Sequence, residues 1–509
     1  MSSIVKSSLA VSFFSLLNVA FLFFVEMLLA RFFGTSVEMD CYLAAVSIPD
    51  LLITVAILGF NYALIPTLVS QLNSNDPQRA YQLINSWLNV VFLFSVTVSI
   101  IGALFSNQII KTFFPGFSEE KIKLAAELLT MYSPVLVLKG SATMISSIFF
   151  ARQKFLLAPI VPAVGSVFAV VILLAFVHKL GIPAAPIALS VSALIQFLIL
   201  MGVYTFQGTY RFEIKWRDEN FKLIGRLMLP LIIGGIFAHS TFVVDRNIAS
   251  NLEAGAISTL GYAAKIIRVL LLIGLGGLSV VALPKISELI AKKDFNQIQN
   301  LNRKALSGIL FVSILFYIVL MNYGEQLISI FFQYGSFSAA DSSNVANTII
   351  LYGGLLIFGA LGTHIAILFY AIPDTKTIAL IGIIGFVFAY ALKLWFSSFM
   401  GYEGIALATT IYYVLSVVLS IYLLQRKELQ FISFKELYID LIKFIVISGI
   451  VVVITFIIHS LLPEKNLFQL LIGLPITIVG FIILSFLFNI ELSSITMFKR
   501  FRESIADEI

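Results

Sequence analysis

Long apolar segments recur along almost the whole chain, and they leave few structures open to it. Fourteen hydrophobic stretches lie near 9–32, 41–70, 83–106, 122–150, 156–178, 183–206, 221–249, 256–284, 304–323, 342–371, 377–399, 403–424, 438–461 and 466–489. Each is long enough to cross a hydrocarbon layer as an α-helix, which satisfies its own backbone hydrogen bonds where no water is present. The sequence therefore predicts an all-α integral membrane protein with fourteen transmembrane helices.

Composition and charge exclude several classes of function. The chain is 60% hydrophobic and 12% charged, against about 25% charged residues in ordinary soluble domains. The net charge is +6, but no run of basic residues resembles a nucleic-acid footprint. The single cysteine, Cys41, excludes an intrachain disulfide, and one Cys and four His form no metal-ligand pattern. We expect no nucleic-acid partner, no metal and no cofactor.

The distribution of basic residues predicts the orientation of the chain. With fourteen helices both termini lie on one side, and the loops and tails of that side hold twenty Lys and Arg residues against five on the other. Cytoplasmic loops carry the excess of positive charge in membrane proteins. Both termini are therefore expected to be cytoplasmic.

An internal repeat organises the helices. Matching residues recur at a shift of 218 positions, at Pro66 and Pro284, Phe113 and Phe331, and Ile187 and Ile405. Unrelated apolar helices would not keep one register over such a length, so we interpret the shift as a true repeat of six helices. An even number of helices gives both repeats the same orientation. The predicted divisions are an N-lobe at 1–210, a C-lobe at 211–430, and two further helices with a tail at 431–509.

A polar stripe interrupts the second apolar segment. Ser47, Asp50, Thr54 and Asn61 fall on one face of a helix there. A carboxylate at membrane depth costs about 2.5 to 3.5 kcal/mol on insertion scales, so the stripe should avoid lipid. It either forms a buried hydrogen-bond network that locks helices together or lines a wet cavity.

The repeat gives this stripe a partner of opposite charge. At the same shift, Ser47 corresponds to Lys265 and Asp50 to Arg268, and residues three apart share a helix face. Two lobes that face each other would bring both stripes to a central cleft whose basic side suits an anionic group. Alternatively, Asp50 pairs with Arg268 as a structural ion pair.

Other charged residues in apolar segments are interpreted by position. Glu26 lies deep in the first helix after an uncharged run and is a candidate for the cavity. Asp245 and Arg246 are expected to belong to an elbow before the eighth helix, as Asp40 does before the second.

Helix breakers are concentrated in the two repeat-equivalent helices. They are Pro49, Pro66, Gly274, Gly276, Gly277 and Pro284. Proline removes a backbone hydrogen bond and glycine relaxes steric limits, so these helices are predicted to bend while the rest stays rigid. Small residues also permit close helix packing, an alternative that applies to the run from Gly274 to Gly277.

Several segments together resemble a known transporter family. They are ARFFGTSVEMDCYLAAVSIPDLL, DRNIASNLEAGAISTLGYAAKI, ALPKIS, FFQYGSFSAAD and FYAIPDTKT. They are similar to the MurJ/MviN lipid II flippases of the multidrug/oligosaccharidyl-lipid/polysaccharide (MOP) exporter superfamily, over about the first 420 residues. The resemblance implies fourteen helices, two six-helix lobes, a central cationic cavity, and a lipid-tail groove beside the last two helices.

The resemblance also bears on individual residues. Asp40 matches an acidic position of the family, Glu26 stands where an acid is familiar, and Lys265 stands where the family has an arginine. The family's arginines in the first helix and early in the second are absent, because 18–25 and 51–54 contain no cation. The predicted substrate-binding residues are Lys265, Arg268, Asp50, Asp40, Glu26, Ser47, Asn61 and Arg31.

The predicted function is that of a flippase, a transporter rather than an enzyme. It would move a polyprenyl-pyrophosphate-linked saccharide across the bacterial cytoplasmic (inner) membrane by alternating access. The missing cations leave lipid II and an O-antigen or exopolysaccharide unit as alternatives. Partners are the glycolipid substrate and membrane lipids, and the chain is expected to be monomeric. Energy would come from an ion gradient, the membrane potential or downstream consumption, because no GxxxxGK loop occurs.

Two other functions fit the sequence less well. A cation-coupled small-molecule exporter of the same superfamily would need only twelve helices. A membrane-embedded glycan polymerase or ligase should carry a large outward loop with catalytic residues, and the longest outward segments here, near 107–121 and 323–341, are short.

Cysteine labelling tests the orientation. In a Cys41→Ser background, Ser118→Cys should react with a membrane-impermeant maleimide added outside, and Ile505→Cys should react only after permeabilisation. Labelling of both positions from one side would disprove the fourteen-helix topology.

Overall fold

The computed structural model describes residues 3–65, 67–68, 77–152, 154, 156–206, 210–292, 294–372, 375–426, 431–461, 469–488 and 490, and the regular elements within them are all helices. They group into two compact units. Unit 1 is Met1–Ser258 with Tyr334–Phe337, and unit 2 is Thr259–Gln333 with Ser338–Ile509. The all-α fold predicted from the apolar segments is confirmed.

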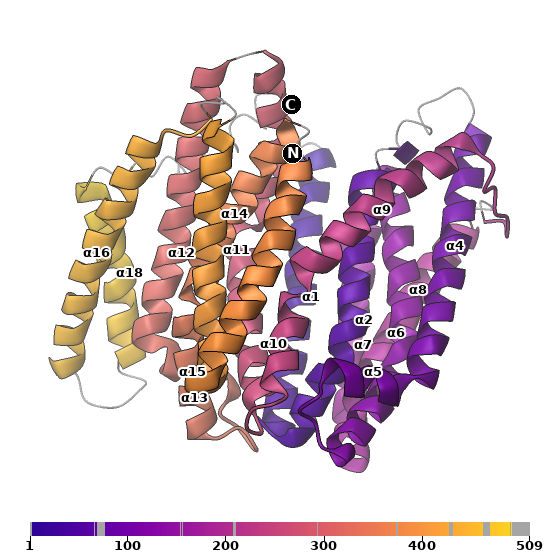
Figure 1. Cartoon of the computed structure of the whole chain (residues 1–509), viewed down its shortest axis with the longest axis horizontal. Coiled ribbons are helices and arrows are strands. Elements are labelled where there is room, and N and C mark those ends of the chain that lie inside the picture. The colour runs from indigo at the N-terminus through magenta and orange to yellow at the C-terminus, as the bar shows by residue number, and fades with distance from the viewer. Residues whose placement is uncertain are drawn as a thin grey trace. The chain divides into compact units, whose positions relative to one another are not determined.

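Unit 1 holds the elements from α1 to α10 (Figure 1). They are α1 (Ser3–Phe33), α2 (Val37–Gly59), the π-helix η1 (Phe60–Leu64), α4 (Pro77–Leu104), α5 (Ser106–Phe113), α6 (Glu119–Ala151), α7 (Leu157–Leu180), α8 (Ala184–Phe206), α9 (Glu219–His239) and α10 (Thr241–Ala249). Within the unit α2 packs against α6 and α9, α6 against α4 and α8, and α7 against α1 and α8.

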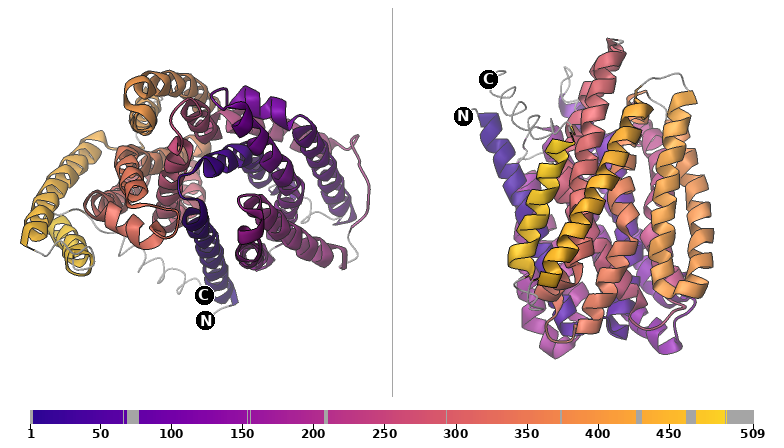
Figure 2. Two further views of the ribbon diagram at one scale, coloured as in Figure 1. Left: turned by 90° about the horizontal axis from the view of Figure 1, so that it is seen from below. Right: turned by 90° about the vertical axis from the view of Figure 1, so that its left-hand side faces the viewer.

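Unit 2 begins inside α11 and holds the rest of the described chain. Its elements are α11 (Ala256–Ala291), α12 (Phe295–Phe332), α13 (Ala339–Leu351), α14 (Gly353–Ala371), α15 (Thr375–Arg426), α16 (Phe434–Leu461), the π-helix η2 (Gln469–Gly473) and α18 (Leu474–Leu487). The last two long helices, α16 and α18, lie side by side, drawn in yellow on the right of Figure 2.

The number of membrane spans agrees with the predicted fourteen helices. Among the described residues, eleven helices are long and apolar enough to cross a membrane, and α13 with α14 forms one bent pair. One of the eleven, α15, is interrupted at Gly401, whose φ is 60°, and so consists of two consecutive helices. Helix α11 adds a further 36 residues, long enough to span at 1.5 Å per residue.

The starts of several helices keep the register of the repeat. Helices α4 and α12 begin 218 residues apart, and so do α7 and α15. The two compact units, in contrast, meet in the sequence at Ser258 and not at the predicted lobe boundary of 210. Helix α9 packs on α2, and the Trp87 and Phe221 rings stack with centroids 4.6 Å apart. The lobe boundaries at 210 and 430, which follow from the repeat, stay a prediction.

Each unit has its own apolar core. In unit 1 buried side chains of η1, α4, α6, α8 and α9 meet, among them Phe60, Ile84, Phe149, Tyr204 and Met228. In unit 2 the core joins α12, α14, α16 and α18 through residues such as Phe311, Leu368, Phe444 and Phe481. Within a membrane such cores are stabilised by van der Waals packing between helices, because lipid tails are as apolar as the packed side chains.

Polar contacts fasten α16 and α18 to α12 inside unit 2. Ser307 Oγ donates to Asp440 Oδ2 at 2.5 Å, and the Tyr323 and Thr477 hydroxyls lie 3.0 Å apart. Asn302 Nδ2 donates to the Phe431 carbonyl at 2.9 Å, while its Oδ1 lies 3.1 Å from His364 Nε2. These buried bonds fix the orientation of the last two helices, because an unpaired polar group there would be costly.

The C-terminal end of α1 is capped by a segment near Ser336, about 300 residues further along the chain. Ser336 N donates to the Arg31 carbonyl at 2.8 Å, and Ser336 Oγ donates to the Phe32 carbonyl at 3.0 Å. The last carbonyls of a helix have no partner within it, so these bonds satisfy them. The two backbones approach so closely that both positions require glycine. A Cβ added to Gly34 would lie 2.4 Å from the Ser336 carbonyl oxygen, and a Cβ added to Gly335 would lie 2.3 Å from the Arg31 carbonyl oxygen.

Replacing Gly34 tests this closure. Gly34 has a φ of +54° and its added Cβ would meet the Ser336 backbone, whereas Gly102 lies inside α4 with no atom within 4 Å of an added Cβ. Gly34→Ala should carry both the strain of a positive φ, about 1 to 2 kcal/mol, and a clash with backbone, while Gly102→Ala carries neither. Thermal unfolding should show a loss for Gly34→Ala that exceeds this strain, and a loss as small as that of Gly102→Ala would contradict a packing role for this turn.

Candidate functional site

A cluster of acidic and phenolic side chains lies among α1, α2 and α6 of unit 1. Tyr132 Oη on α6 donates to Asp50 Oδ1 on α2 at 2.8 Å. Tyr42 and Tyr132 are 2% and 3% exposed, and both lie within electrostatic range of Glu26 and Asp50. Glu26 and Asp50, two of the predicted binding residues, thus lie near the same two tyrosines, which were not among the predicted residues.

The close packing of α2 on α6 explains this arrangement. Helix α2 packs against α6 and contains small residues that are almost fully buried, among them Ala44, Ala45 and Ser47. Small side chains let two membrane helices approach closely. At such an approach a tyrosine hydroxyl on one helix can reach a carboxylate on the other, and the bond offsets part of the cost of a carboxylate in an apolar layer.

The hydroxyls of Ser47 and Thr54 share the face of α2 that carries Asp50, but they bond within their own helix. Ser47 Oγ donates to the Ala44 carbonyl at 2.6 Å, and Thr54 Oγ1 donates to the Asp50 carbonyl at 2.8 Å. Both hydroxyls are therefore satisfied by their own helix. Asn61 lies in η1, where the change of helical period alters which face a residue occupies, and it is exposed.

Asp40 has a capping function. Its Oδ2 accepts from the Gly255 N–H at 2.7 Å and its Oδ1 from the Ser258 N–H at 2.8 Å. These donors belong to the start of α11 and have no acceptor within that helix. Both carboxylate oxygens of Asp40 are thus engaged, and the side chain is 2% exposed, so its geometry favours helix capping over the predicted contact with substrate.

Arg246 is a buried cation that the sequence analysis assigned to an elbow. It lies on α10, is 6% exposed, and its Nη1 donates to the Leu43 carbonyl at 2.6 Å. Its guanidinium also lies over the Phe242 ring, 5.6 Å from the centroid, and within electrostatic range of Tyr42. The sequence did contain a signal for this contact, an arginine inside an apolar segment, because a charge at membrane depth is rarely found without a partner.

The predicted basic residues of the second half lie on α11. Lys265 is half-buried and Arg268 is exposed, and Arg268 Nε lies 3.4 Å from the Ala264 carbonyl that accepts from it. Their spacing of three residues gives them neighbouring positions on one helix face. The eighth of the predicted binding residues, Arg31, is exposed at the end of α1.

The predicted hinge residues have different settings. Pro49 is buried within α2, which passes into η1 after Gly59, and π-helical turns often occur at functional sites. A Cβ on Gly274 would meet Val312 and Phe316 of α12 within 3 Å, so this glycine allows close packing. Gly276, Gly277 and Pro284 lie within α11, while Pro66 falls outside the described residues.

The described residues include no group of three or more His, Cys, Asp or Glu placed to hold a metal ion. What unit 1 offers is a carboxylate pair with hydroxyl donors, and what α11 offers is a pair of cations. Both suit the binding of charged groups and protons, and neither forms a nucleophile with an adjacent base.

The fold defines a class of membrane transporters. The structure is similar to an inward-facing multidrug resistance MATE family transporter of the MOP superfamily, with a TM-score of 0.68 and 13% identity over 80% of this chain and 98% of that one. It is similar to "Lipid II flippase MurJ, inward closed conformation" with a TM-score of 0.81 and 24% identity, over 96% of this chain and 99% of that one. These likenesses assign a MOP-type fold.

Sequence comparisons assign the family. The sequence profile of the family "Lipid II flippase MurJ" matches residues 29–475. "Probable lipid II flippase MurJ" of Buchnera aphidicola subsp. Baizongia pistaciae is 26% identical over 91% of both chains, and that of Vibrio cholerae is 24% identical over 84% of this chain and 86% of the relative. The chain belongs to the MurJ lipid II flippase family, a family of transporters and not of enzymes.

Family membership confirms the resemblance inferred from the sequence motifs and extends it toward the C-terminus, because the match continues to residue 475. Together with the apolar helices, it makes the chain a multi-pass protein of the cytoplasmic membrane.

The capping function of Asp40 can be separated from substrate binding. Asp40→Ala should lower the unfolding free energy of the purified protein by about 2 kcal/mol, because it removes a helix cap that is buried. Glu38→Ala removes an exposed acid from the same helical turn and should change stability little. Thermal unfolding without substrate gives the readout, and a stable Asp40→Ala variant that fails to transport would instead support substrate contact.

Proposed function

We propose that this protein translocates a polyprenyl-pyrophosphate-linked saccharide across the cytoplasmic membrane by alternating access, as a monomer with both termini in the cytoplasm. The relatives that share 24 to 26% identity are named as lipid II flippases, so lipid II is the first candidate among such saccharides. The observation that carries the proposal is the pair Lys265 and Arg268 on one face of α11, within a chain of this family.

The chemistry of the substrate requires fixed cations. A pyrophosphate carries at least two negative charges, and its transfer into a membrane protein without counter-charges would cost many kcal/mol of solvation. An arginine can bind it through two parallel hydrogen bonds, whereas a lysine acts as a point charge. Arg268 would therefore orient the pyrophosphate and Lys265 would add to the attraction.

In unit 1 a buried cation lies on α10, and not in the first two helices, where the resemblance to the family would place arginines. Residues 18–25 of the first helix and 51–54 of the second contain no cation, and Arg246 on α10 is a buried cation close to Tyr42. Its bond to the Leu43 carbonyl holds it in place. Substrate binding would therefore depend mainly on Lys265 and Arg268.

The Glu26 and Asp50 cluster is the proposed place for coupling to an energy source. Two carboxylates in apolar surroundings repel each other when both are charged, and binding of a proton or small cation removes that repulsion. Such a change would also alter the Tyr132–Asp50 bond between α6 and α2. This links an ion gradient to the packing of two helices within unit 1.

A complementation assay tests the cation pair. In cells depleted of their own flippase, Lys265→Ala and Arg268→Ala should each reduce transport about tenfold, the loss expected when one charge-assisted hydrogen bond of about 1.5 kcal/mol is removed. Lys111→Ala removes an exposed lysine that is paired with Glu119 and should transport normally. Mass spectrometry of the lipid-linked saccharide that accumulates identifies the substrate.

Two results would change the assignment. Full transport by Arg268→Ala would refute its role in binding. Restoration of Arg268→Ala by the additional change Asp50→Asn would favour a structural ion pair, because removal of both partners leaves no buried charge uncompensated.

A further inference from the structure

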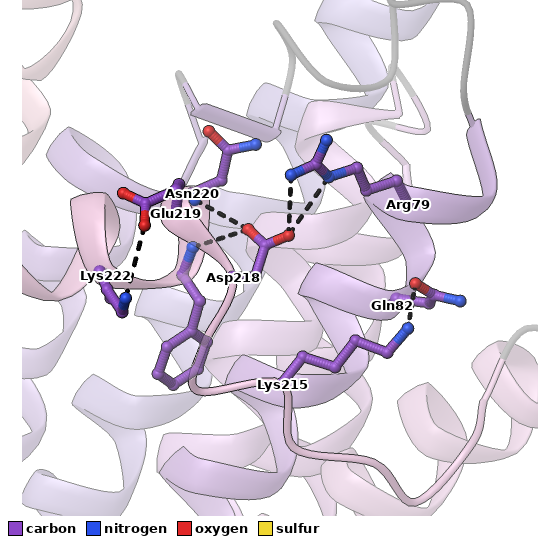
Figure 3. Close-up of polar contacts among 8 residues, drawn as sticks. Arg79, Gln82, Lys215, Asp218, Glu219, Asn220 and Lys222 are labelled. Carbon is purple, nitrogen blue, oxygen red and sulfur yellow. Dashed lines mark hydrogen bonds and ion pairs between the residues drawn. The ribbon is translucent and has the colours of Figure 1, made fainter.

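Residues 210–218 of the linker between α8 and α9 are irregular, with a turn at Trp216 and Arg217, and they are bound along the first four turns of α4. Figure 3 shows Arg79 and Gln82 of α4 facing Asp218 and Lys215 of the linker. Arg79 Nε and Nη2 both donate to Asp218 Oδ2, at 3.2 and 3.0 Å, and Lys215 Nζ donates to Gln82 Oε1. The linker is therefore anchored at its α9 end by side chains of one helix.

The same helix holds the rest of the linker through its backbone. Ser86 Oγ accepts from the Lys215 N–H at 3.0 Å, and Asn89 Nδ2 donates to the carbonyls of Arg211 and Glu213 at 3.3 and 3.0 Å. Ser86 and Asn89 are fully or almost fully buried. Polar residues at this spacing on a membrane helix are costly unless paired, and the linker provides the partners.

Because the backbone faces α4, the side chains on the other side of the linker face outward. Phe212 and Trp216 are 69% and 72% exposed, and Arg211 and Arg217 are also exposed. Aromatic rings and guanidinium groups together are typical of segments that lie at a membrane interface.

The acidic groups of the linker are compensated within the protein, and two of its cations are not. Glu213 pairs with Lys215 at 3.8 Å and Asp218 pairs with Arg79. Burial acts to raise the pKa of Asp218, but hydrogen bonds from Arg79 and the backbone of α9 outweigh it and hold that pKa below its usual range. Within the described part of the chain no ion pair engages Arg211 or Arg217, so the outward face is positively charged.

The position of the linker along α4 matches the edge of the hydrocarbon layer. From Arg79 to Asn89 the helix rises by about 15 Å at 1.5 Å per residue. The exposed apolar side chains of α4 begin just beyond, at Phe92, Leu93 and Phe94. The Arg211 and Phe212 end of the linker, beside Asn89, thus lies where acyl chains meet headgroups.

We propose that the outward face of residues 210–217 is a docking site for the headgroups of anionic phospholipids, with Arg211 and Arg217 binding phosphate and Phe212 and Trp216 inserting among the headgroups. In the predicted orientation these lipids belong to the inner leaflet. Since Asp218 is the N-cap residue of α9, bound lipid would also hold the start of that helix at the membrane surface. The site does not depend on the identity of the transported substrate.

Quenching of Trp216 fluorescence tests the site in the intact protein. The full chain is placed in nanodiscs of phosphatidylcholine and phosphatidylglycerol at a 4:1 ratio, with bromine on only one of the two lipids. The difference between wild type and Trp216→Phe isolates the signal of this residue from Trp87 and Trp395. Brominated phosphatidylglycerol should quench Trp216 about threefold more strongly per mole, because each basic residue near the surface attracts anionic lipid several-fold.

Charge variants give the matched comparison. Arg211→Gln/Arg217→Gln changes only exposed side chains and keeps the backbone bonds to Asn89, so the fold and the quenching by phosphatidylcholine should persist while the preference disappears. Lys123→Gln/Lys179→Gln removes two exposed cations elsewhere in unit 1 and should retain the preference. In the wild type, 0.5 M NaCl should weaken it, because salt screens charges at exposed sites.

Three outcomes would overturn the proposal. Equal quenching by the two brominated lipids would mean that anionic headgroups are not selected. An absence of quenching would place the linker in water. Loss of the preference on addition of inorganic phosphate, at an ionic strength matched with NaCl, would mean that the arginines form a site for soluble phosphate instead of lipid.

Discussion

Every backbone amide and carbonyl that lies away from water must find a partner within this chain, and the rest of the structure depends on this requirement. It explains why the regular elements of the described chain are helices. It also explains why helix ends engage residues distant in sequence. Ser336 satisfies the last carbonyls of α1, and Asp40 satisfies the first amides of α11. In both cases the cap comes from a segment that the sequence marks by glycine or an acid.

The same requirement applies to polar side chains, and it distinguishes those that stabilise the fold from those that the proposals use to bind a ligand. Ser47 and Thr54 bind carbonyls of their own helix, so their hydroxyl groups add little polarity to a cavity. Asp50 accepts a hydrogen bond from a hydroxyl on another helix. The polar side chains of α4 form hydrogen bonds with the backbone of the linker 210–218. The cations on which the two proposals depend are different, because the side chains of Lys265 and Arg268 on α11 and of Arg211 and Arg217 on the linker are half-buried or exposed.

Much of the fold was predictable because it follows from local properties. Segment length and hydropathy predicted the helices, and the 218-residue register predicted which of them begin in equivalent positions, as α4 and α12 do. The site was predictable only in part. Glu26 and Asp50, selected for their depth in the apolar segments, lie near the same two tyrosines, Tyr42 and Tyr132, which were missed. Arg246 was assigned to an elbow and not to the site. A tyrosine on an apolar helix gives no local signal, because its role depends on which helix packs against it.

The sequence by itself determined that this is a multi-pass helical membrane protein with a repeated architecture and the motifs of its family, since hydropathy, charge asymmetry and motifs act over short distances along the chain. Only the tertiary structure decided the partner of each polar group. Asp40 could have faced a cavity or capped a helix, and the choice was made by the position of Gly255 and Ser258, more than 200 residues away. A hydrogen bond requires donor and acceptor atoms about 3 Å apart. Helix periodicity does not specify which distant part of the backbone will lie that close.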